Sequence, residues 1–157
     1  MRWFWIDRFL EFEPGKRAVS VKNISLAEEH LHDHWDGCPI MPASLMIEGM
    51  AQTGGLLVGQ ANNFEHDVVL AKISKAEFYG LAVPGDQLTY EAVIENIAPE
   101  AASIRGVVRK NGEEFGQIDI MYSHANNSIS GVELPERFVF TGSLHRMVEP
   151  FLETKNG

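Results

Sequence analysis

The chain is poor in cysteine, in basic residues and in long hydrophobic runs. Cys38 is the one cysteine among 157 residues, so no disulfide can form within the chain, which fits a reducing compartment. Thirteen Lys and Arg stand against 22 Asp and Glu, and a formal net charge of -9 without a basic stripe argues against nucleic-acid binding. No stretch approaches the roughly 18 uninterrupted apolar residues of a membrane span. Because Asp7 and Arg8 interrupt the apolar N-terminus, we expect a cytoplasmic protein without a secretory signal.

The composition is otherwise that of an ordinary globular protein, with 45% hydrophobic and 22% charged residues. No internal repeat or low-complexity tract is present, and Pro and Gly fall singly between periodic segments. A chain of this length buries roughly 70% of its unfolded surface, which is enough for a substantial core. We therefore expect one domain followed by a C-terminal tail.

Periodicity predicts one strand, one buried helix and a strand-rich second half. Residues 17–24 alternate between polar and apolar after a Pro-Gly turn, which is typical of a half-buried strand. Residues 42–60 are apolar on nearly every side at helical spacing and contain four glycines, which indicates an enclosed, closely packed helix. Further strands are predicted at 67–78, 87–97, 102–109 and 114–122, the last two flanking the hairpin signal Asn111-Gly112. This order favours an α+β fold in which an antiparallel sheet wraps around the helix.

The tail after Tyr122 has a weaker pattern. Residues 137–140 could add a strand. Ser143 is suited to cap a short helix over residues 144–148.

The segment from His30 to Pro42, directly before the predicted helix, holds the densest group of reactive side chains, and several interpretations of it stay open. His30, His32 and His34 would share one face of a strand, as the imidazoles of a zinc triad do. The spacing is one residue short of the metallo-hydrolase pattern His-x-His-x-Asp-His, so we expect no metal. Cys38 lies near His34, but a nucleophilic thiol needs a base beside it in space. We expect His30 and His32 to be solvated loop residues.

Glu48 is the one charged residue of the predicted helix, and it must be paired, neutral or functional among apolar neighbours such as Leu45 and Met50. Such surroundings favour the protonated carboxyl group and make Glu48 a candidate proton donor in acid–base chemistry with His34. Gln52, one helical turn later, could orient it. An ordinary glutamate that reaches solvent or a polar neighbour explains the position equally well.

The run from His34 to Gln52, HWDGCPIMPASLMIEGMAQ, resembles the signature of the FabZ-type (3R)-hydroxyacyl-acyl-carrier-protein dehydratases. That family's pattern is His-Phe-Pro-Gly-x-Pro-Ile-Met-Pro-Gly, then apolar residues and Glu-Ala-Met-Ala-Gln. Two more stretches match in order, one within Ile6–Lys16 and one within Lys72–Leu88. The likeness covers roughly three quarters of the chain, from Ile6 to Tyr122, and three ordered motifs are far more specific than one.

The resemblance implies a dehydratase that removes water from (3R)-hydroxyacyl thioesters to give trans-2-enoyl thioesters, in fatty acid or related lipid biosynthesis, without a metal or organic cofactor. It implies that His34 is the catalytic histidine and Glu48 the catalytic acid, and that different subunits of a dimer contribute them. The backbone N–H of Ala43 would polarise the thioester carbonyl. A hot-dog thioesterase and a non-catalytic binding module for acyl chains or carrier proteins are the alternatives.

The same resemblance implies a hot-dog fold over residues 1–122, and we expect the extension over residues 123–157 to pack on this domain or on a partner subunit. A homodimer, or a trimer of such dimers, would bind a substrate carried by acyl carrier protein or coenzyme A. Phe78 and Tyr90 are placed to line an apolar acyl tunnel, although ordinary strand core explains them as well. Acyl carrier proteins are acidic, so docking needs a basic patch, for which the candidates are Lys72, Lys75, Arg105, Arg109 and Lys110.

Several positions depart from the family's pattern. Asp36 stands where the family has Pro, and its negative charge beside the histidine favours imidazolium. Ala43 adds a methyl group where the family has Gly. Gly49 stands where the family has Ala. These changes leave the catalytic pair in place.

Overall fold

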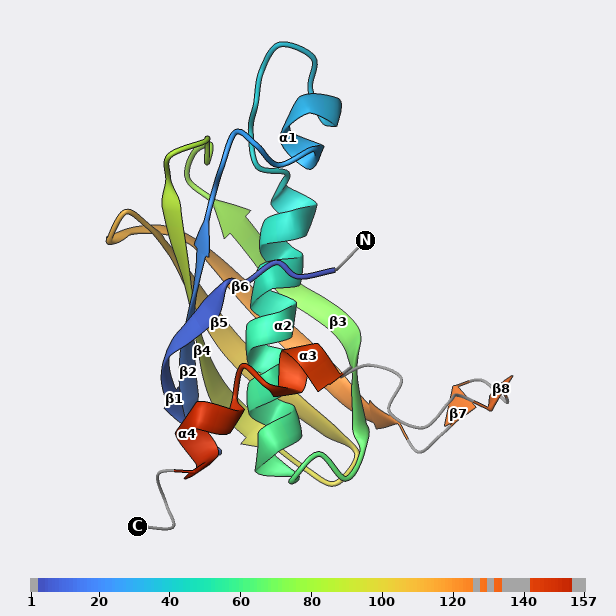
Figure 1. The fold of residues 1–157 in the computed structure, drawn as a ribbon. Coiled ribbons are helices and arrows are strands. Elements are labelled where there is room, and N and C mark those ends of the chain that lie inside the picture. The colour runs from blue at the N-terminus through green and yellow to red at the C-terminus, as the bar shows by residue number, and fades with distance from the viewer. Residues whose placement is uncertain (1–2, 126–127, 130–131, 134–141, 154–157) are drawn as a thin grey trace.

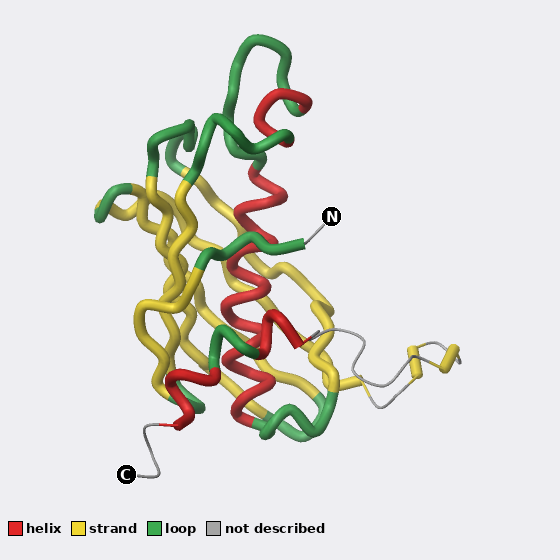
Figure 2. The backbone as a smooth tube through the Cα atoms, viewed as in Figure 1, coloured by secondary structure: helices red, strands yellow, loops and turns green. Residues whose placement is uncertain are grey.

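The computed structural model describes residues 3–125, 128–129, 132–133 and 142–153. One six-stranded antiparallel sheet forms a curved layer, and helix α2 (Ala43–Ala61) lies along one face of it (Figures 1 and 2). The strand order is β1-β2-β4-β5-β6-β3. This is the α+β architecture expected from the sequence, with a long helix held by an antiparallel sheet.

The five strands predicted between residues 17 and 122 are all present, with ends that differ by at most three residues. The sheet consists of β1 (Arg8–Glu13), β2 (Arg17–Asn23), β3 (Asp67–Phe78), β4 (Gln87–Ile97), β5 (Ala101–Lys110) and β6 (Glu113–Ala125). Asn111 and Gly112 join β5 to β6 with φ values of 52° and 89°. Two positive φ angles are what a tight two-residue hairpin turn requires, so the hairpin prediction is confirmed.

Strand β1 is an addition to the sequence-based prediction. It pairs with β2 across the Pro14-Gly15 turn and forms one edge of the sheet. Its register shifts between Phe9 and Glu11, and Phe9 is its one buried residue. The bulge interrupts the period of two that usually reveals a strand in a sequence.

Helix α2 is buried along most of its length, as its apolar sequence predicts. Met50, Leu56 and Leu57 are fully buried in the core between the helix and the sheet. Gly54 lies so close to Ile104 and Tyr122 that a Cβ atom here would overlap both side chains. Close approach of this kind is the reason that the helix tolerates glycines, which cost about 1 kcal/mol each relative to Ala.

Residues 142–153 of the C-terminal part contribute side chains to the core. Helix α3 (Gly142–His145) overlaps only the start of the helix predicted over 144–148, and Ser143 lies within it instead of capping it. Helix α4 (Glu149–Leu152) begins after the predicted helix ends. Leu144 and Val148 are buried in the core, and the Phe151 ring lies 6.5 Å from that of Phe9. Two short strands, β7 (Ser128–Ile129) and β8 (Val132–Glu133), pair with each other. The strand predicted at 137–140 lies outside the described residues.

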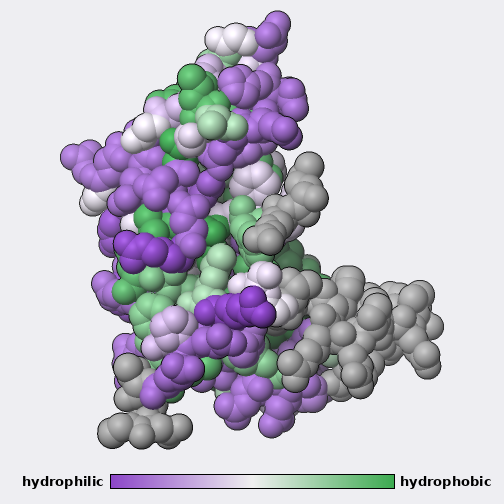
Figure 3. Space-filling view, viewed as in Figure 1, coloured by the Kyte–Doolittle hydropathy of each residue, from purple (hydrophilic) through white to green (hydrophobic). Residues whose placement is uncertain are grey.

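In Figure 3, hydrophobic residues gather in the middle of the face that carries α2, with hydrophilic residues above and below them. The half-buried Leu45, Ile47 and Ala51 of α2 pack against the core. Within the described residues, no helix is both long and apolar enough to cross a membrane.

Candidate active site

The N-terminal end of α2 presents free backbone donors. Pro42 occupies the N-cap with φ -60° and ψ 136°, and Ala43 is the first helical residue. The first N–H groups of a helix have no partner within it, and the helix dipole adds positive charge there. Ala43 is exposed, and no described group accepts a hydrogen bond from its N–H. Its role as an oxyanion donor stays a prediction.

Glu48 lies on the second turn of α2 and is held by two N–H donors. The Gln52 amide, one turn further, donates to Oε1 of Glu48 at 3.1 Å, and the Trp3 indole Nε1 donates to the same oxygen at 3.1 Å. Gln52 also accepts the backbone N–H of Trp5 at 2.9 Å and donates to the carbonyl oxygen of Trp3 at 2.9 Å. The predicted pairing of Gln52 with Glu48 is therefore present.

The contribution of Trp3 and Trp5 to this site is absent from the sequence-based prediction. They belong to the segment that crosses α2 before β1 begins (Figure 1). Their contacts with Gln52 and Glu48 span 45 to 49 positions of the chain, and local spacing carries no signal of such contacts. The sequence contains one signal that could have pointed to them. Two of its three tryptophans, Trp3 and Trp5, lie just before the charged pair Asp7-Arg8.

His34 is the C-cap residue of the short helix α1 (His30–Asp33). Its backbone N–H donates to the carbonyl oxygen of His30 at 3.2 Å, and its side chain is exposed. Among the described residues, no hydrogen bond or ion pair joins His34 to Glu48. One chain therefore contains both predicted catalytic groups without joining them.

The helical conformation of residues 30–33 corrects the strand that the zinc-triad interpretation required. At 100° per residue, His32 lies on the side of α1 opposite to His30, so the three imidazoles do not share one face. The His30 ring packs edge-on against Trp5, with centroids 4.9 Å apart, and burial lowers its pKa. The His32 ring bonds the carbonyl oxygen of Leu26 at 2.7 Å. In the described part of the chain, no three His, Cys, Asp or Glu residues converge on a possible metal position.

His30 is less exposed than the solvated loop residue that the sequence predicts, whereas His32 and Cys38 are exposed. His30 is half-buried rather than solvated, and its Nε2 has no hydrogen-bond partner among the described residues. His32 is exposed, as expected. Cys38 is an exposed free thiol, and its backbone N–H donates to the carbonyl oxygen of Trp35 at 3.0 Å.

Tyr90 is fully buried on β4, and its ring lies against Gly49 of α2. A Cβ atom at Gly49 would stand 2.7 Å from two ring carbons and 2.9 Å from the hydroxyl oxygen. This contact gives a physical reason for Gly where the family has Ala. Burial raises the pKa of the Tyr90 phenol, whose oxygen has no hydrogen-bond partner in the described part of the chain.

Phe78 ends β3 and is half-buried. Its ring centroid is 6.0 Å from that of Phe115. Both Phe78 and Tyr90 thus lie in or against the core, and their role as tunnel-lining residues stays a prediction.

The basic side chains considered for carrier docking are mostly neutralised by acidic neighbours. Four of the five form ion pairs: Lys75 with Glu77, Arg105 with Glu95, Arg109 with Glu91, and Lys110 with Asp86. Lys72 is exposed on β3 and has no ion pair among the described residues. These residues therefore do not form a free basic patch in this conformation.

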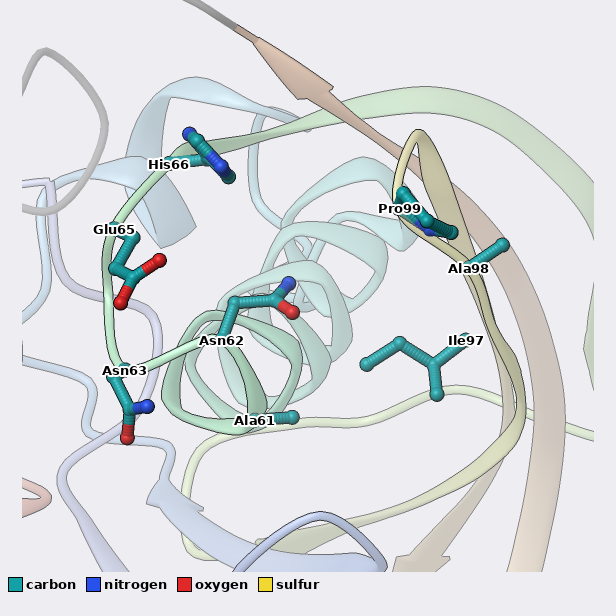
Figure 4. Close-up of a pocket in the computed structure, with 8 residues that line it drawn as sticks. All are labelled: Ala61, Asn62, Asn63, Glu65, His66, Ile97, Ala98 and Pro99. Atoms are coloured by element: carbon teal, nitrogen blue, oxygen red, sulfur yellow. The ribbon is translucent and has the colours of Figure 1, made fainter.

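A surface pocket of about 560 Å³ lies at the opposite end of α2 (Figure 4). Its lining residues are Ala61, Asn62, Asn63, Glu65, His66, Ile97, Ala98 and Pro99. Eighteen helical steps of 1.5 Å separate it from Ala43, a distance of about 27 Å along the axis. The pocket is therefore separate from the motif that contains Glu48.

Comparison with known proteins matches most of the chain. A FabA-like domain matches residues 3–118. The 3-hydroxyacyl-acyl-carrier-protein dehydratase FabZ of Clostridium acetobutylicum is 36% identical over 118 residues, covering 74% of this chain and 84% of the relative. The bifunctional enzyme LpxC/FabZ of Chlorobaculum tepidum is 43% identical over 118 residues, covering 74% of this chain and 25% of the relative.

Solved structures share the fold at low sequence identity. The dehydratase heterocomplex ApeI:P from Xenorhabdus doucetiae matches with a TM-score of 0.67 at 15% identity, covering 79% of this chain and 84% of that chain. The smu.793 protein of Streptococcus mutans, bound to acetyl CoA, matches with a TM-score of 0.62 at 12% identity, covering 76% and 88%. With the six-stranded sheet around α2, these matches confirm the hot-dog fold. The sequence and domain matches together show that this chain belongs to the FabZ-type dehydratase family of FabA-like proteins.

Proposed function

We propose that this chain is a dehydratase that converts (3R)-hydroxyacyl thioesters of acyl carrier protein into trans-2-enoyl thioesters. The observation that carries the proposal is Glu48, the one charged residue of α2, held by two N–H donors in a chain of the FabZ-type family. Its relatives are named as acyl-carrier-protein dehydratases, which supports the carrier. The role is in fatty acid or related lipid biosynthesis.

The proposed reaction is a balanced elimination that uses two side chains and one backbone donor. His34 takes the proton next to the thioester carbonyl, while the Ala43 N–H and the dipole of α2 stabilise the negative charge on the carbonyl oxygen. The C–O bond at the β-carbon then breaks, and Glu48 protonates the departing hydroxyl group, which leaves as water. The electron pair of the lost C–H bond forms the double bond. Return of a proton from His34 to Glu48 resets the pair.

The assembly that we propose is a homodimer in which His34 of one subunit faces Glu48 of the other. Strand β3 supports this, because it ends the sheet and leaves one edge unpaired by the described strands. Leu70 and Ile73 on β3 are 38% and 41% exposed. An open edge strand with exposed apolar side chains readily pairs with another chain.

The carrier is the finer part of the proposal. Acyl carrier protein is acidic, and this chain has a formal net charge of -9. Because most candidate basic residues already form ion pairs, docking must draw on Lys72 or open the existing pairs. Turnover of the same acyl group on acyl carrier protein and on coenzyme A distinguishes the two carriers.

The test is an absorbance assay for the enoyl thioester with purified protein and a (3R)-3-hydroxyacyl thioester of acyl carrier protein. His34→Ala and Glu48→Gln each remove one acid–base group, so we expect kcat to fall by about 10² to 10⁴. His32→Ala is the matched control and keeps wild-type turnover. Free thiol without enoyl product would identify a thioesterase, and unchanged turnover in both variants would contradict the assigned roles.

Mixing the two inactive variants tests whether subunits share a site. If His34 and Glu48 come from different subunits, random exchange gives half heterodimers with one intact site of two, so about a quarter of wild-type activity returns. No recovery after verified subunit exchange would place both groups in the same subunit's site. A mass measurement separates a dimer from a trimer of dimers.

A further inference from the structure

The two oxygens of the Glu48 carboxyl group have different surroundings. Oε1 receives N–H bonds from Gln52 and from Trp3, both at 3.1 Å. Oε2 receives no hydrogen bond from any described residue. A carbonyl-type oxygen has two lone-pair directions, and two N–H donors occupy both. The acid proton of neutral Glu48 is therefore directed to Oε2.

The Gln52 amide is oriented by the backbone. Its oxygen accepts the N–H of Trp5 at 2.9 Å, which forces its NH₂ group to point toward Glu48 and the Trp3 carbonyl. Gln52 is 6% exposed, so water does not compete for these bonds. Oε1 of Glu48, which faces Gln52, consequently receives a hydrogen bond from the Gln52 amide.

The Trp3 indole is positioned by the same network. Its backbone carbonyl is bound by Gln52, and its ring packs edge-on against Trp5 with centroids 5.3 Å apart. Trp5 in turn packs against His30 of α1, the helix that ends next to His34. The N-terminal segment thus contacts α2, which carries Glu48, and α1, which ends directly before His34.

We propose that Trp3 is a positioning residue whose indole N–H, together with Gln52, saturates Oε1 of Glu48 and leaves Oε2 to deliver the proton to the departing hydroxyl group. This rests on the proposed dehydratase function. Without the indole N–H, the proton can reside on either oxygen, and only a fraction of the molecules present it in the productive direction.

The test compares two substitutions at one position. Trp3→Phe keeps an aromatic ring against Trp5 and removes the N–H. Trp3→His keeps a ring N–H that can reach Glu48, because histidine Nε2 is the same number of bonds from the backbone as tryptophan Nε1. Trp3 is 55% exposed, so neither change opens a cavity in the core. Kinetics of the purified variants are measured between about pH 6 and pH 10, around the range where acid–base groups titrate.

For Trp3→Phe we expect kcat to fall about five- to tenfold, the usual effect of one hydrogen bond, with KM nearly unchanged. Above the pH range in which the introduced imidazole titrates, Trp3→His is expected to recover most of the wild-type rate.

The outcomes separate this proposal from the proposed function. A wild-type protein without dehydratase activity refutes the function. An active wild type with unchanged kcat in Trp3→Phe refutes the positioning role alone. An equal loss of kcat in Trp3→Phe and in Trp3→His also refutes it and assigns Trp3 to general structural support.

Discussion

The contact between Gly49 and Tyr90 makes Gly49→Ala an informative test of the packing around the candidate site. The change restores the alanine of the FabZ-type pattern in a helix, where Ala is ordinarily about 1 kcal/mol better than Gly. In this chain the new methyl carbon would stand 2.7 Å from two carbons of the Tyr90 ring. Helix propensity therefore predicts that Gly49→Ala raises the free energy of unfolding, whereas packing predicts that it lowers it.

The structure indicates that packing wins. Non-bonded carbons are normally about 3.5 to 4 Å apart, and the Tyr90 ring is rigid and fully buried, so it has little room to retreat. Overpacking of a core costs about 1 to 3 kcal/mol. Because the methyl carbon would stand 2.7 Å from two ring carbons, we expect a cost in the upper part of this range, about 2 to 3 kcal/mol. After a gain of about 1 kcal/mol in helix propensity, the net loss in the free energy of unfolding is roughly 1 to 2 kcal/mol. For a chain of this size, that lowers Tm by about 2 to 8 °C.

A double-mutant cycle with Tyr90→Leu isolates the contact. Replacing the ring makes space for the methyl group, so the double variant should be more stable than the sum of the single changes predicts by at least about 1 kcal/mol. Urea unfolding followed by tryptophan fluorescence provides the free energies. All variants are compared at one protein concentration, because association would make stability concentration-dependent.

Two outcomes would refute this reasoning. A Gly49→Ala variant as stable as the wild type, or more stable, would show that helix propensity outweighs the contact with Tyr90. Strict additivity in the cycle would show that any loss in Gly49→Ala arises elsewhere in α2.

Two further predictions concern pH and the C-terminal helices. Burial lowers the pKa of His30 below its ordinary 6.5, so the unfolded chain binds more protons than the folded one as pH falls through that value, and stability decreases on acidification. The difference in urea midpoint between about pH 5 and pH 8 should therefore shrink in His30→Gln, and an equal difference would contradict this. Truncation after Ala125 removes the buried Leu144 and Val148, each worth about 1.5 to 3 kcal/mol, and should lower Tm by at least about 6 °C; an unchanged Tm would show that the extension adds no stability.

The main strands could be predicted because each combines a periodic pattern with a turn signal. Strands β3 and β4 match the predicted ranges, and the Asn111-Gly112 turn has the two positive φ angles that its residues suit. Strand β1 was missed because only Phe9 is buried and a bulge breaks its alternation. Alternation of polar and apolar residues reveals a strand only when one face is regularly buried. It therefore does not reveal an irregular edge strand such as β1.

The helical turn over residues 30–33, where a loop was expected, was missed for a different reason. Histidines at every second position have the period of a strand, but the chain forms one helical turn that buries Leu31 and places His30 against Trp5. A helix this short has little stability of its own, so tertiary contacts decide its conformation. The sequence of residues 30–33 alone does not predict those contacts.

The surroundings of Glu48 show where prediction from sequence ends and what the fold adds. Gln52 could be predicted as its partner because residues four apart share a helix face. Trp3 could not, because its contact with Glu48 depends on how the N-terminal segment crosses α2. The next residue, Gly49, brings the opposing constraint, since the Tyr90 ring of β4 fills the space of a side chain there. The helical turn that carries Glu48 is thus fixed by hydrogen bonds from the N-terminal segment and by close packing from the sheet. Among the described residues, this carboxyl group receives hydrogen bonds on one oxygen and none on the other, and the proposed direction of proton transfer depends on that difference.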